Sequence, residues 1–336
     1  MTTGFLHLSA HFGERQRAGR VFVAEALLDL FTEREVASSV MLRGIAGFGA
    51  RHVLRTDRTL SLSEDPPVVV TAVDTAVKIE AILGGVAGLM RRGLVTVQQA
   101  DLLAGDLPDL AGDADDAVKL TVHVGRGRHI DGRPGYRAVC ALLREAGFAG
   151  AVAFLGVDGV THGQRRRAHF FSRNDDVPAR VVAVGTPDQT RAVLPGLTAA
   201  LDRPLLTVQR TRVCKRDGVL LDRPSWHRKL VISNDEATLH DGAPIHRALV
   251  RRLREERVAS GATVLRGIWG YHGDREPHGD RLVQLGRRVP VATTVVDTPE
   301  RIAAAFDIVD EVTATHGLVT CESVPTVLAV GGPDGR

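Results

Sequence analysis

The fold of this chain is decided by a nine-residue stretch, VMLRGIAGF, at Val40–Phe48. The pattern returns as TVLRGIWGY at Thr263–Tyr271 and, less faithfully, as VAFLGVDGV at Val152–Val160. Each version is typical of a β-strand that ends in a glycine turn, with two glycines three residues apart. The first glycines stand at positions 44, 156 and 267, so the intervals are 112 and 111 residues. This regular self-similarity indicates three tandem copies of one structural unit.

Hydrophobic periodicity around the first glycine pattern predicts a unit of about 100 residues. Val21, Ala24 and Leu28 recur at helical spacing, which indicates a helix with one buried face. The expected elements are a strand at 5–8, a helix at 20–34, strands at 36–45 and 68–73, a helix from 74 to about 92, and a strand at 93–97. This β-α-β-β-α-β order is typical of the ferredoxin-like split βαβ sandwich.

The second and third units follow the same order after polar linkers. DGRP at Asp131–Pro134 precedes the first helix of the second unit, and DGAP at Asp241–Pro244 repeats it in the third. We predict units at 1–104, 117–215 and 227–330, the second with a degenerate glycine turn. The expected fold class is α/β (α+β): three four-stranded antiparallel sheets with helices outside, arranged around a pseudo-threefold axis.

Composition indicates a soluble globular protein. The 336 residues suffice for two or three domains, and 44% are hydrophobic and 25% charged. No apolar run reaches the roughly 18 residues of a membrane span, and the N-terminus has no signal-peptide pattern. The net charge of +3 is too small to indicate nucleic acid. Three dispersed cysteines, Cys140, Cys214 and Cys321, favour a reduced, cytoplasmic setting.

The repeated motifs resemble a known family. LRGIAGFG at Leu42–Gly49, LSEDPPV at Leu62–Val68 and GLVT at Gly93–Thr96 are similar to the PII-like proteins catalogued as domain of unknown function number one hundred and ninety. The third unit matches nearly as well, through GATVLRG at Gly261–Gly267 and GLVT at Gly317–Thr320. The second unit keeps the scaffold but has Leu155 in place of the arginine.

This resemblance implies both an assembly and a role. Single-copy members usually form trimers, so three copies in one chain imply a covalent pseudo-trimer that is monomeric as a chain. The wider PII group binds adenine nucleotides or related small ligands between subunits and relays occupancy through the loop after the second strand. Some family members are encoded beside fluoride-channel genes, which points to a membrane transporter or channel as partner.

The glycine turns are the candidate ligand site, because glycine lets backbone N–H groups face an anion. Arg43 and Arg266 offer forked donors to a phosphate or carboxylate, whereas Leu155 does not, so we expect unequal sites. The alternative is that the glycines only allow a bulge or close strand packing. The full set of expected ligand-binding residues is Arg43, Gly44, Gly47, Gly49, Arg51, Arg55, Gly156, Gly159, Arg266, Gly267 and Gly270.

Basic loops at 49–59, 161–168 and 272–281 follow the turns and are expected to be the least ordered internal segments outside the linkers, as solvated loops or as contacts for a partner or phosphate. Aromatic residues amount to 4%, too few for a stacking surface that binds nucleic acid. The 13 histidines show no ligand spacing, so we expect no metal site. No serine elbow or reactive cysteine is apparent, and we expect neither an enzyme nor a resident cofactor.

Two other functions fit the same architecture. One is a metal-handling protein of the copper-tolerance type, and the other is a structural trimeric adaptor without a ligand. The preferred interpretation is a PII-like regulatory protein that senses a small anionic ligand, such as an adenine nucleotide, in clefts between the repeats and acts on a partner.

Overall fold

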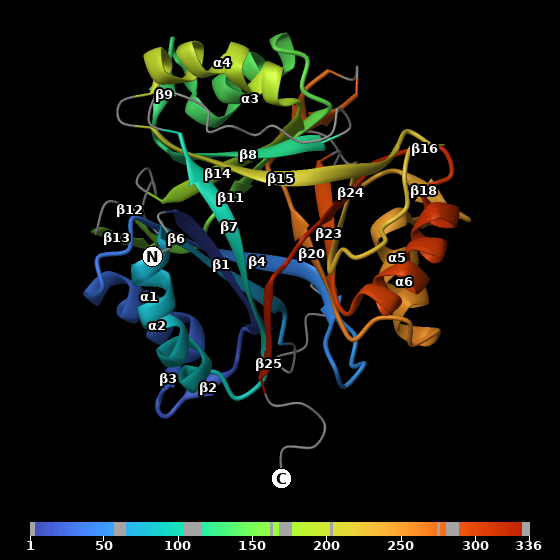
Figure 1. The fold of residues 1–336 in the computed structure, drawn as a ribbon, viewed down its shortest axis with the longest axis horizontal. Coiled ribbons are helices and arrows are strands. Elements are labelled where there is room, and N and C mark those ends of the chain that lie inside the picture. Colours follow the sequence, from blue (N-terminus) through green and yellow to red (C-terminus); the bar gives the residue numbers. More distant parts are fainter. Residues whose placement is uncertain are drawn as a thin grey trace.

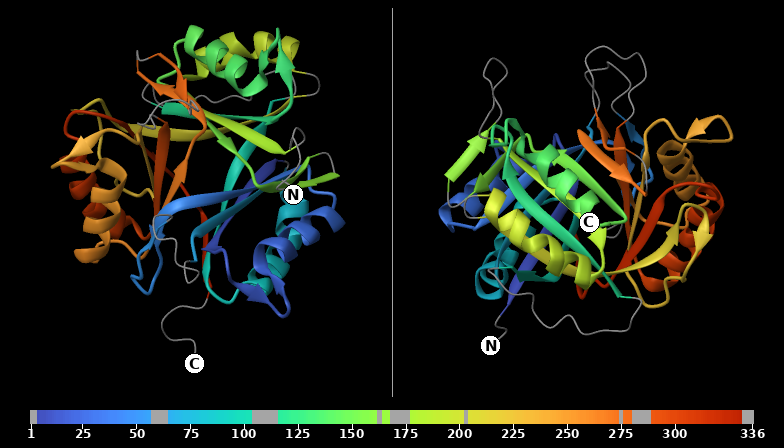
Figure 2. Two further views of the ribbon diagram at one scale, coloured as in Figure 1. Left: turned by 180° about the vertical axis from the view of Figure 1, so that it is seen from behind. Right: turned by 90° about the horizontal axis from the view of Figure 1, so that it is seen from above.

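The computed structural model describes residues 4–56, 65–103, 116–161, 164–167, 177–201, 204–273, 276–279 and 289–330. Three similar units surround a common centre, with their helices on the outside (Figure 1). The view from behind and the view from above show the same arrangement of sheets inside and helix pairs outside (Figure 2). The predicted ferredoxin-like fold with three tandem units is therefore confirmed.

Repeat one is built as the sequence predicts, although its strands are longer. Its elements are β1 (Phe5–Gly13), α1 (Val23–Glu33), β4 (Ser38–Phe48), β6 (Pro67–Thr75), α2 (Ala76–Leu89) and β7 (Gly93–Leu102), with the short strands β2 (Arg17–Ala18), β3 (Val21–Phe22) and β5 (Arg55–Thr56). The strand order is β4-β6-β1-β7, and every pair is antiparallel. Both helices pack on one face of this sheet around Leu8, Leu27 and Ile79.

Repeat two has the same order of elements. They are β8 (Asp116–Gly125), α3 (Gly135–Glu145), β11 (Gly150–Leu155), β12 (Asp158–Thr161), β14 (Pro178–Gly185), α4 (Pro187–Ala200) and β15 (Leu205–Arg216), with the short strands β9 (His129–Ile130), β10 (Arg133–Pro134), β13 (Gln164–Arg167) and β16 (Val219–Leu220). Helix α4 begins with a capping box between Thr186 and Gln189 and has Pro187 in its first turn.

Repeat three completes the chain. Its elements are β17 (Lys229–Asp235), α5 (Ile245–Glu255), β20 (Ala262–Arg266), β21 (Trp269–His272), β23 (Pro290–Val296), α6 (Pro299–Val312), β24 (Leu318–Glu322) and β25 (Thr326–Val330), with the short strands β18 (Leu239–His240), β19 (Ala243–Pro244) and β22 (His278–Gly279). Each repeat has its own helix-covered core, and Val40, Leu42, Val152, Phe154 and Leu265 form a further apolar cluster that joins all three.

The predicted end of the strand at the first glycine is found in repeats two and three, where β11 ends at Leu155 and β20 at Arg266 and a new strand starts after two residues, but it is wrong for repeat one. In repeat one the chain continues as a strand through Gly44 and Gly47, and the end of β4 pairs with β20 of repeat three. In the same way β21 of repeat three pairs with β11 of repeat two, and β12 of repeat two pairs with β4 of repeat one. The glycines therefore mark the place where each second strand crosses to a neighbouring repeat, and the three crossings close a cycle.

The fourth strands close a second cycle. The end of β7 pairs with β15, the end of β15 pairs with β24, and β25 returns to pair with β7. The expectation of three separate four-stranded sheets is thus corrected: hydrogen bonds join the sheets of all three repeats into one. Paired edges cannot recruit further strands, so the described sheet protects its own edges. No helix among the described residues is long and apolar enough to cross a membrane.

Candidate functional site

The crossing glycines are in close contact with backbone from a neighbouring repeat. A Cβ atom on Gly47 would lie 2.5 Å from the carbonyl oxygen of Ala262, and one on Gly159 would lie 2.3 Å from that of Ser39. A Cβ on Gly270 would lie 2.2 Å from the carbonyl oxygen of Ala151. Only glycine allows this approach, so the glycines serve close strand packing at each crossing.

Backbone donors at the crossings are already engaged. Gly156 N–H donates to the carbonyl of Pro178 at 2.9 Å, and Gly267 N–H donates to that of Pro290 at 2.7 Å. The next N–H in each case donates across the boundary, from Val157 to Met41 at 2.9 Å and from Ile268 to Ala153 at 2.8 Å. An anion at these crossings would therefore rely on side chains rather than on backbone N–H groups.

Both predicted arginines form ion pairs within their own repeat. Arg43 pairs with Glu14 at 2.5 Å, and its side chain is 57% exposed. Arg266 pairs with Glu236 through two hydrogen bonds, at 2.5 and 3.0 Å. Glu14 and Glu236 hold equivalent positions, since the N–H of each donates to the carbonyl just before the third strand.

Repeat two lacks both members of this glutamate–arginine ion pair. Arg126 holds the position equivalent to Glu14 and Glu236, and it too donates its N–H to the carbonyl before the third strand. Leu155 replaces the arginine and packs against the core of repeat two. Both the glutamate and the arginine are thus replaced in the same repeat, as expected if each is needed to pair with the other.

Repeat one brings a second arginine to the same edge. Arg55 pairs with Asp65 at 3.0 Å, and Asp65 also accepts a hydrogen bond from the N–H of Arg15 at 2.6 Å. Arg43 and Arg55 therefore converge around residues 13–15, where β1 ends. Gly49 and Arg51 are exposed, and nothing lies within 4 Å of the Cβ position at Gly49.

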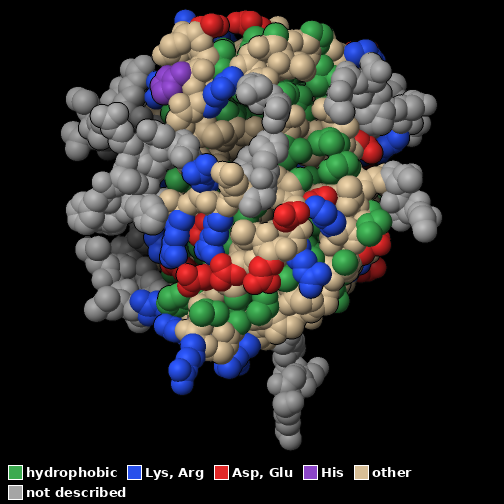
Figure 3. All heavy atoms as spheres, turned by 90° about the vertical axis from the view of Figure 1, so that its left-hand side faces the viewer, with side chains coloured by type: hydrophobic (Ala, Val, Ile, Leu, Met, Phe, Trp, Pro, Cys, Tyr) green, Lys and Arg blue, Asp and Glu red, His purple; other side chains and the backbone are tan. Residues whose placement is uncertain are grey.

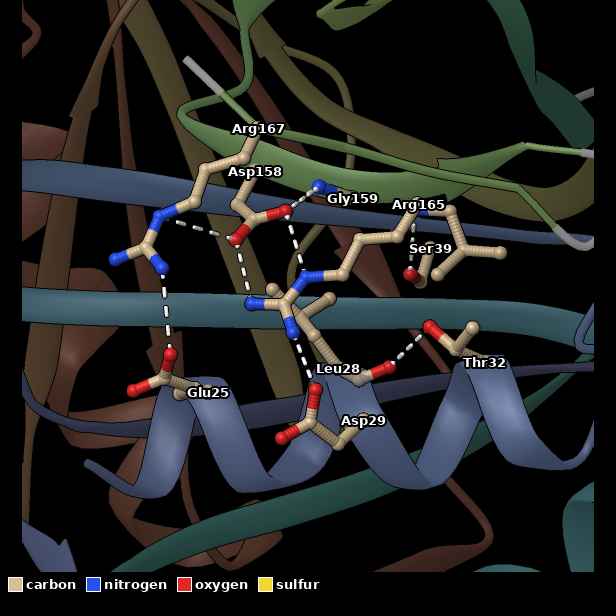
Figure 4. Close-up of polar contacts among 10 residues, drawn as sticks. Glu25, Leu28, Asp29, Thr32, Ser39, Asp158, Gly159, Arg165 and Arg167 are labelled. Atoms are coloured by element: carbon tan, nitrogen blue, oxygen red, sulfur yellow. Dashed lines mark hydrogen bonds and ion pairs between the residues drawn. The ribbon is translucent and has the colours of Figure 1, made fainter. Parts of the chain in front are cut away.

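The basic segment of repeat two forms part of a hairpin that lies on repeat one. Residues 164–167, expected in a loop, form β13 and pair with β12; the remaining residues of the three basic loops lie partly outside the described ranges. Arg165 bridges Asp158 of the hairpin, at 2.7 Å, and Asp29 on α1. Arg167 pairs with Glu25 on the same helix at 3.3 Å. Figure 4 shows these contacts, and a row of acidic side chains beside basic ones is visible in Figure 3.

Sequence reasoning missed a buried polar group where the three repeats meet. Here Nε2 of Gln98 in repeat one, Nζ of Lys119 in repeat two and Nζ of Lys229 in repeat three surround Oε2 of Glu322, at 2.9, 2.6 and 3.0 Å. Around them lie His7, His11, His123 and Arg180, which act electrostatically on the lysines or on one another. We call these eight residues the junction cluster.

The junction cluster arises from equivalent positions of the repeats. His7, Lys119 and Lys229 occupy one position in the three first strands, opposite Gln98, Gln209 and Glu322 in the fourth strands. The one sequence signal is therefore a charged or polar residue at the same place in strands that are otherwise apolar. Their convergence on one atom follows from the threefold arrangement and cannot be inferred from a single repeat.

Burial shifts the pKa values of the titratable side chains in the junction cluster. Desolvation lowers the pKa of Lys119 to about 8, although Glu322 opposes this effect. Desolvation followed by the charge of Arg180 lowers the pKa of His123 to about 3, and desolvation with Lys229 and Arg180 does the same for His11. Burial alone would raise the pKa of the Glu322 carboxyl, but Lys119 and Lys229 lower it well below its usual range. The histidines are therefore neutral at pH 7, whereas Glu322 is charged.

Two of the dispersed cysteines also meet across a boundary. Sγ of Cys214 in repeat two lies 2.9 Å from Sγ of Cys321 in repeat three, both as free thiols in the core. Cys140 lies in α3 and is buried, and burial raises its pKa to about 12. Among the described residues, no group of three or more His, Cys, Asp or Glu side chains is arranged to hold a metal ion.

Comparison with known proteins agrees with the internal repeat. A curated relative, a UPF0166 protein from Aquifex aeolicus (strain VF5), is 33% identical over 100 residues, which is 30% of this chain and 90% of that protein. A solved structure of an anthrone oxidase-like protein aligns over 65% of this chain and 95% of its own at 11% identity, and the TM-score of 0.19 shows that the two folds are not alike. The family described as DUF190, Uncharacterized ACR, COG1993, matches residues 5–102, 117–213 and 227–326, so this chain belongs to that PII-like family and contains three copies of its domain.

Proposed function

We propose that this protein is a cytoplasmic regulatory protein of PII type, without catalytic activity, that binds a small anionic ligand at the boundaries between its repeats. The observation that carries the proposal is the convergence of Arg43 and Arg55 on residues 13–15, beside the crossing from repeat one to repeat three. Both arginines are solvent-accessible and are balanced by single carboxylates that an anion can replace. An adenine nucleotide is the preferred ligand class, since two arginines match a polyphosphate.

The hairpin of repeat two supports a route from ligand to partner. It leans on α1 of repeat one through ion pairs in which Asp29 and Arg167 are largely exposed. Exposed ion pairs contribute about 0–1 kcal/mol each, so this contact is easily changed. Ligand binding at the boundary of repeat one would shift this hairpin. The hairpin would in turn contact a partner protein, such as a membrane transporter or channel.

Titration calorimetry with ATP, ADP and AMP tests the proposal on the full chain. Arg43→Leu is expected to weaken nucleotide binding about tenfold to a hundredfold, because a charge-assisted hydrogen bond is lost. Glu14→Gln breaks the same ion pair but frees Arg43, so it should preserve or tighten binding. Arg266→Leu should remove the second site, and Arg133→Leu, on an exposed position of repeat two, is the control.

The two variants of one pair separate ligand binding from structure. If Arg43 serves only to hold Glu14, then Arg43→Leu and Glu14→Gln will lower stability alike and leave calorimetry unchanged. Absence of nucleotide binding to the unmodified chain, or three equal sites per chain, would contradict the proposal.

A further inference from the structure

The junction cluster holds more positive than negative charge. Lys119 and Lys229 share one carboxylate oxygen of Glu322. Arg180 acts electrostatically on Lys119, but the hydrogen bond found for it within the described chain is a long one, 3.4 Å, to Thr71 Oγ1. With the histidines neutral, three cations thus face one anion. Burying charge without compensation is costly, so this excess requires an explanation.

Polar atoms without partners lie in the same place. Nδ1 of His7, Nε2 of His123, Nε of Arg180 and Oε1 of Glu322 are all inaccessible to solvent and have no hydrogen-bond partner among the residues that the structure describes. Buried polar atoms are nearly always hydrogen-bonded, and four exceptions in one cluster indicate that something else completes it. His7, His11 and His123 retain partial exposure, so the cluster borders space wide enough for water.

We propose that the junction cluster binds a small inorganic anion of single charge, held by Lys119, Lys229 and Arg180. Water would satisfy the unpaired atoms but would leave the excess charge in place. A metal cation is disfavoured despite the three histidines, because the lysines and Arg180 would repel it. An anion would accept hydrogen bonds from the cationic groups, Nε of Arg180 among them, and would lower the excess from two positive charges to one; Oε1 of Glu322, itself an acceptor, is left to water.

The position of this site gives it a structural consequence. Lys119 belongs to repeat two and Lys229 to repeat three, while Gln98 of repeat one contacts Lys229 at 3.2 Å. An anion bound here contacts groups that only the assembled pseudo-trimer brings together, so it stabilises the joined state. The site is separate from the arginines at the crossings and does not depend on the proposed nucleotide ligand.

Bromide is a suitable probe, because it can be located by anomalous scattering. Crystals of the full chain soaked in sodium bromide should show an anomalous peak within hydrogen-bonding distance of the Lys119 and Lys229 ammonium groups or the Arg180 guanidinium. In solution, sodium bromide should raise the unfolding temperature relative to sodium gluconate at equal ionic strength.

Variants connect the effect to the cluster. Lys119→Met and Arg180→Met should each weaken the apparent bromide affinity about tenfold or more. Glu322→Gln removes the competing carboxylate and should tighten it by a similar factor, even though this variant is less stable. Arg133→Met removes an exposed charge and should behave as the unmodified chain.

The proposal is overturned if no anomalous peak appears at the cluster, or if bromide stabilises all variants equally. If Lys119→Met does not fold, the bromide affinity of Glu322→Gln still tests the proposal, because that variant is expected to bind bromide more tightly. Nucleotide titrations of the same variants report on the crossings separately, so failure at one site is not mistaken for failure at the other.

Discussion

At the scale of single residues, the glycine pattern was predicted correctly as the centre of the fold but was interpreted too locally. Two glycines three apart suggested a turn because the sequence of one repeat contains no partner strand for the residues that follow. The partner strand belongs to another repeat, and glycine is required because the backbone of that strand lies so close. Likewise Glu14 and Arg43 are 29 residues apart in the chain, so their pairing is visible only once the strands are in register.

Substitution of a crossing glycine should destabilise the whole chain. In Gly159→Ala the new Cβ meets the Ser39 carbonyl, and the pairing of β12 with β4 must shift, at a cost of about 1–3 kcal/mol. The matched control is Gly84→Ala in the exposed middle of α2, where nothing lies within 4 Å. There alanine should stabilise by about 0.5–1 kcal/mol. Urea denaturation measures both, and an unchanged midpoint for Gly159→Ala would refute the packing role.

At the scale of elements, helices and strands followed from periodicity, whereas contacts between elements of different repeats did not. The helical spacing of Ala24 and Leu28 in α1 and the apolar run at 68–73 in β6 are local patterns, and the sequence predicts both elements. The sequence predicts a poorly ordered basic loop at 161–168, because three consecutive arginines carry no apolar period, whereas residues 164–167 form β13. Its order over 164–167 comes from Asp158 and from the acidic face of α1, which only tertiary structure places beneath it.

The two aspartates that Arg165 bridges, Asp158 and Asp29, should contribute very differently to the free energy of unfolding. Asp158 is 4% exposed and accepts from Gly159 N–H as well as from Arg165, so Asp158→Asn should cost about 1–3 kcal/mol. The side chain of Asp29 is 55% exposed, and Asp29→Asn should change stability by less than about 0.5 kcal/mol. Denaturant unfolding gives the stabilities, and hydrogen exchange over 158–167 should rise in Asp158→Asn. Equal effects for both variants would show that the hairpin is not held by its buried acid.

At the scale of the whole molecule, the threefold arrangement was predictable because intervals of 112 and 111 residues require three like units. The junction cluster was not, because the repeats have diverged at the very positions that meet. His7, Lys119 and Lys229 look unremarkable one at a time, and their chemistry depends on Glu322, which replaces the glutamine of the other two repeats. Divergence among equivalent positions is what a covalent trimer permits and a symmetric trimer of identical chains does not.

The neutral histidines of the junction make stability depend on pH. His11 and His123 have pKa values of about 3 in the folded protein, below the ordinary value of 6.5. Between about pH 3 and pH 6.5 the unfolded chain binds more protons at these histidines than the folded protein does. The free energy of unfolding therefore falls as the solution is acidified below pH 6.5. The slope reaches at most about 1.4 kcal/mol per pH unit for each such residue. Glu322 has a lowered folded pKa, so its contribution is lost in the same direction at lower pH.

His123→Ser tests this dependence with the residue that repeat three already uses at the equivalent position, Ser233. Urea unfolding at pH 7.5, 6.5, 5.5 and 4.5 should give a shallower decline for the variant than for the unmodified chain, because one proton fewer is taken up on unfolding. His129→Gln, which changes an exposed histidine of the same repeat, should keep the original slope. Parallel curves for His123→Ser and the unmodified chain would mean that His123 binds as many protons in the folded state as in the unfolded state, so that folding does not lower its pKa.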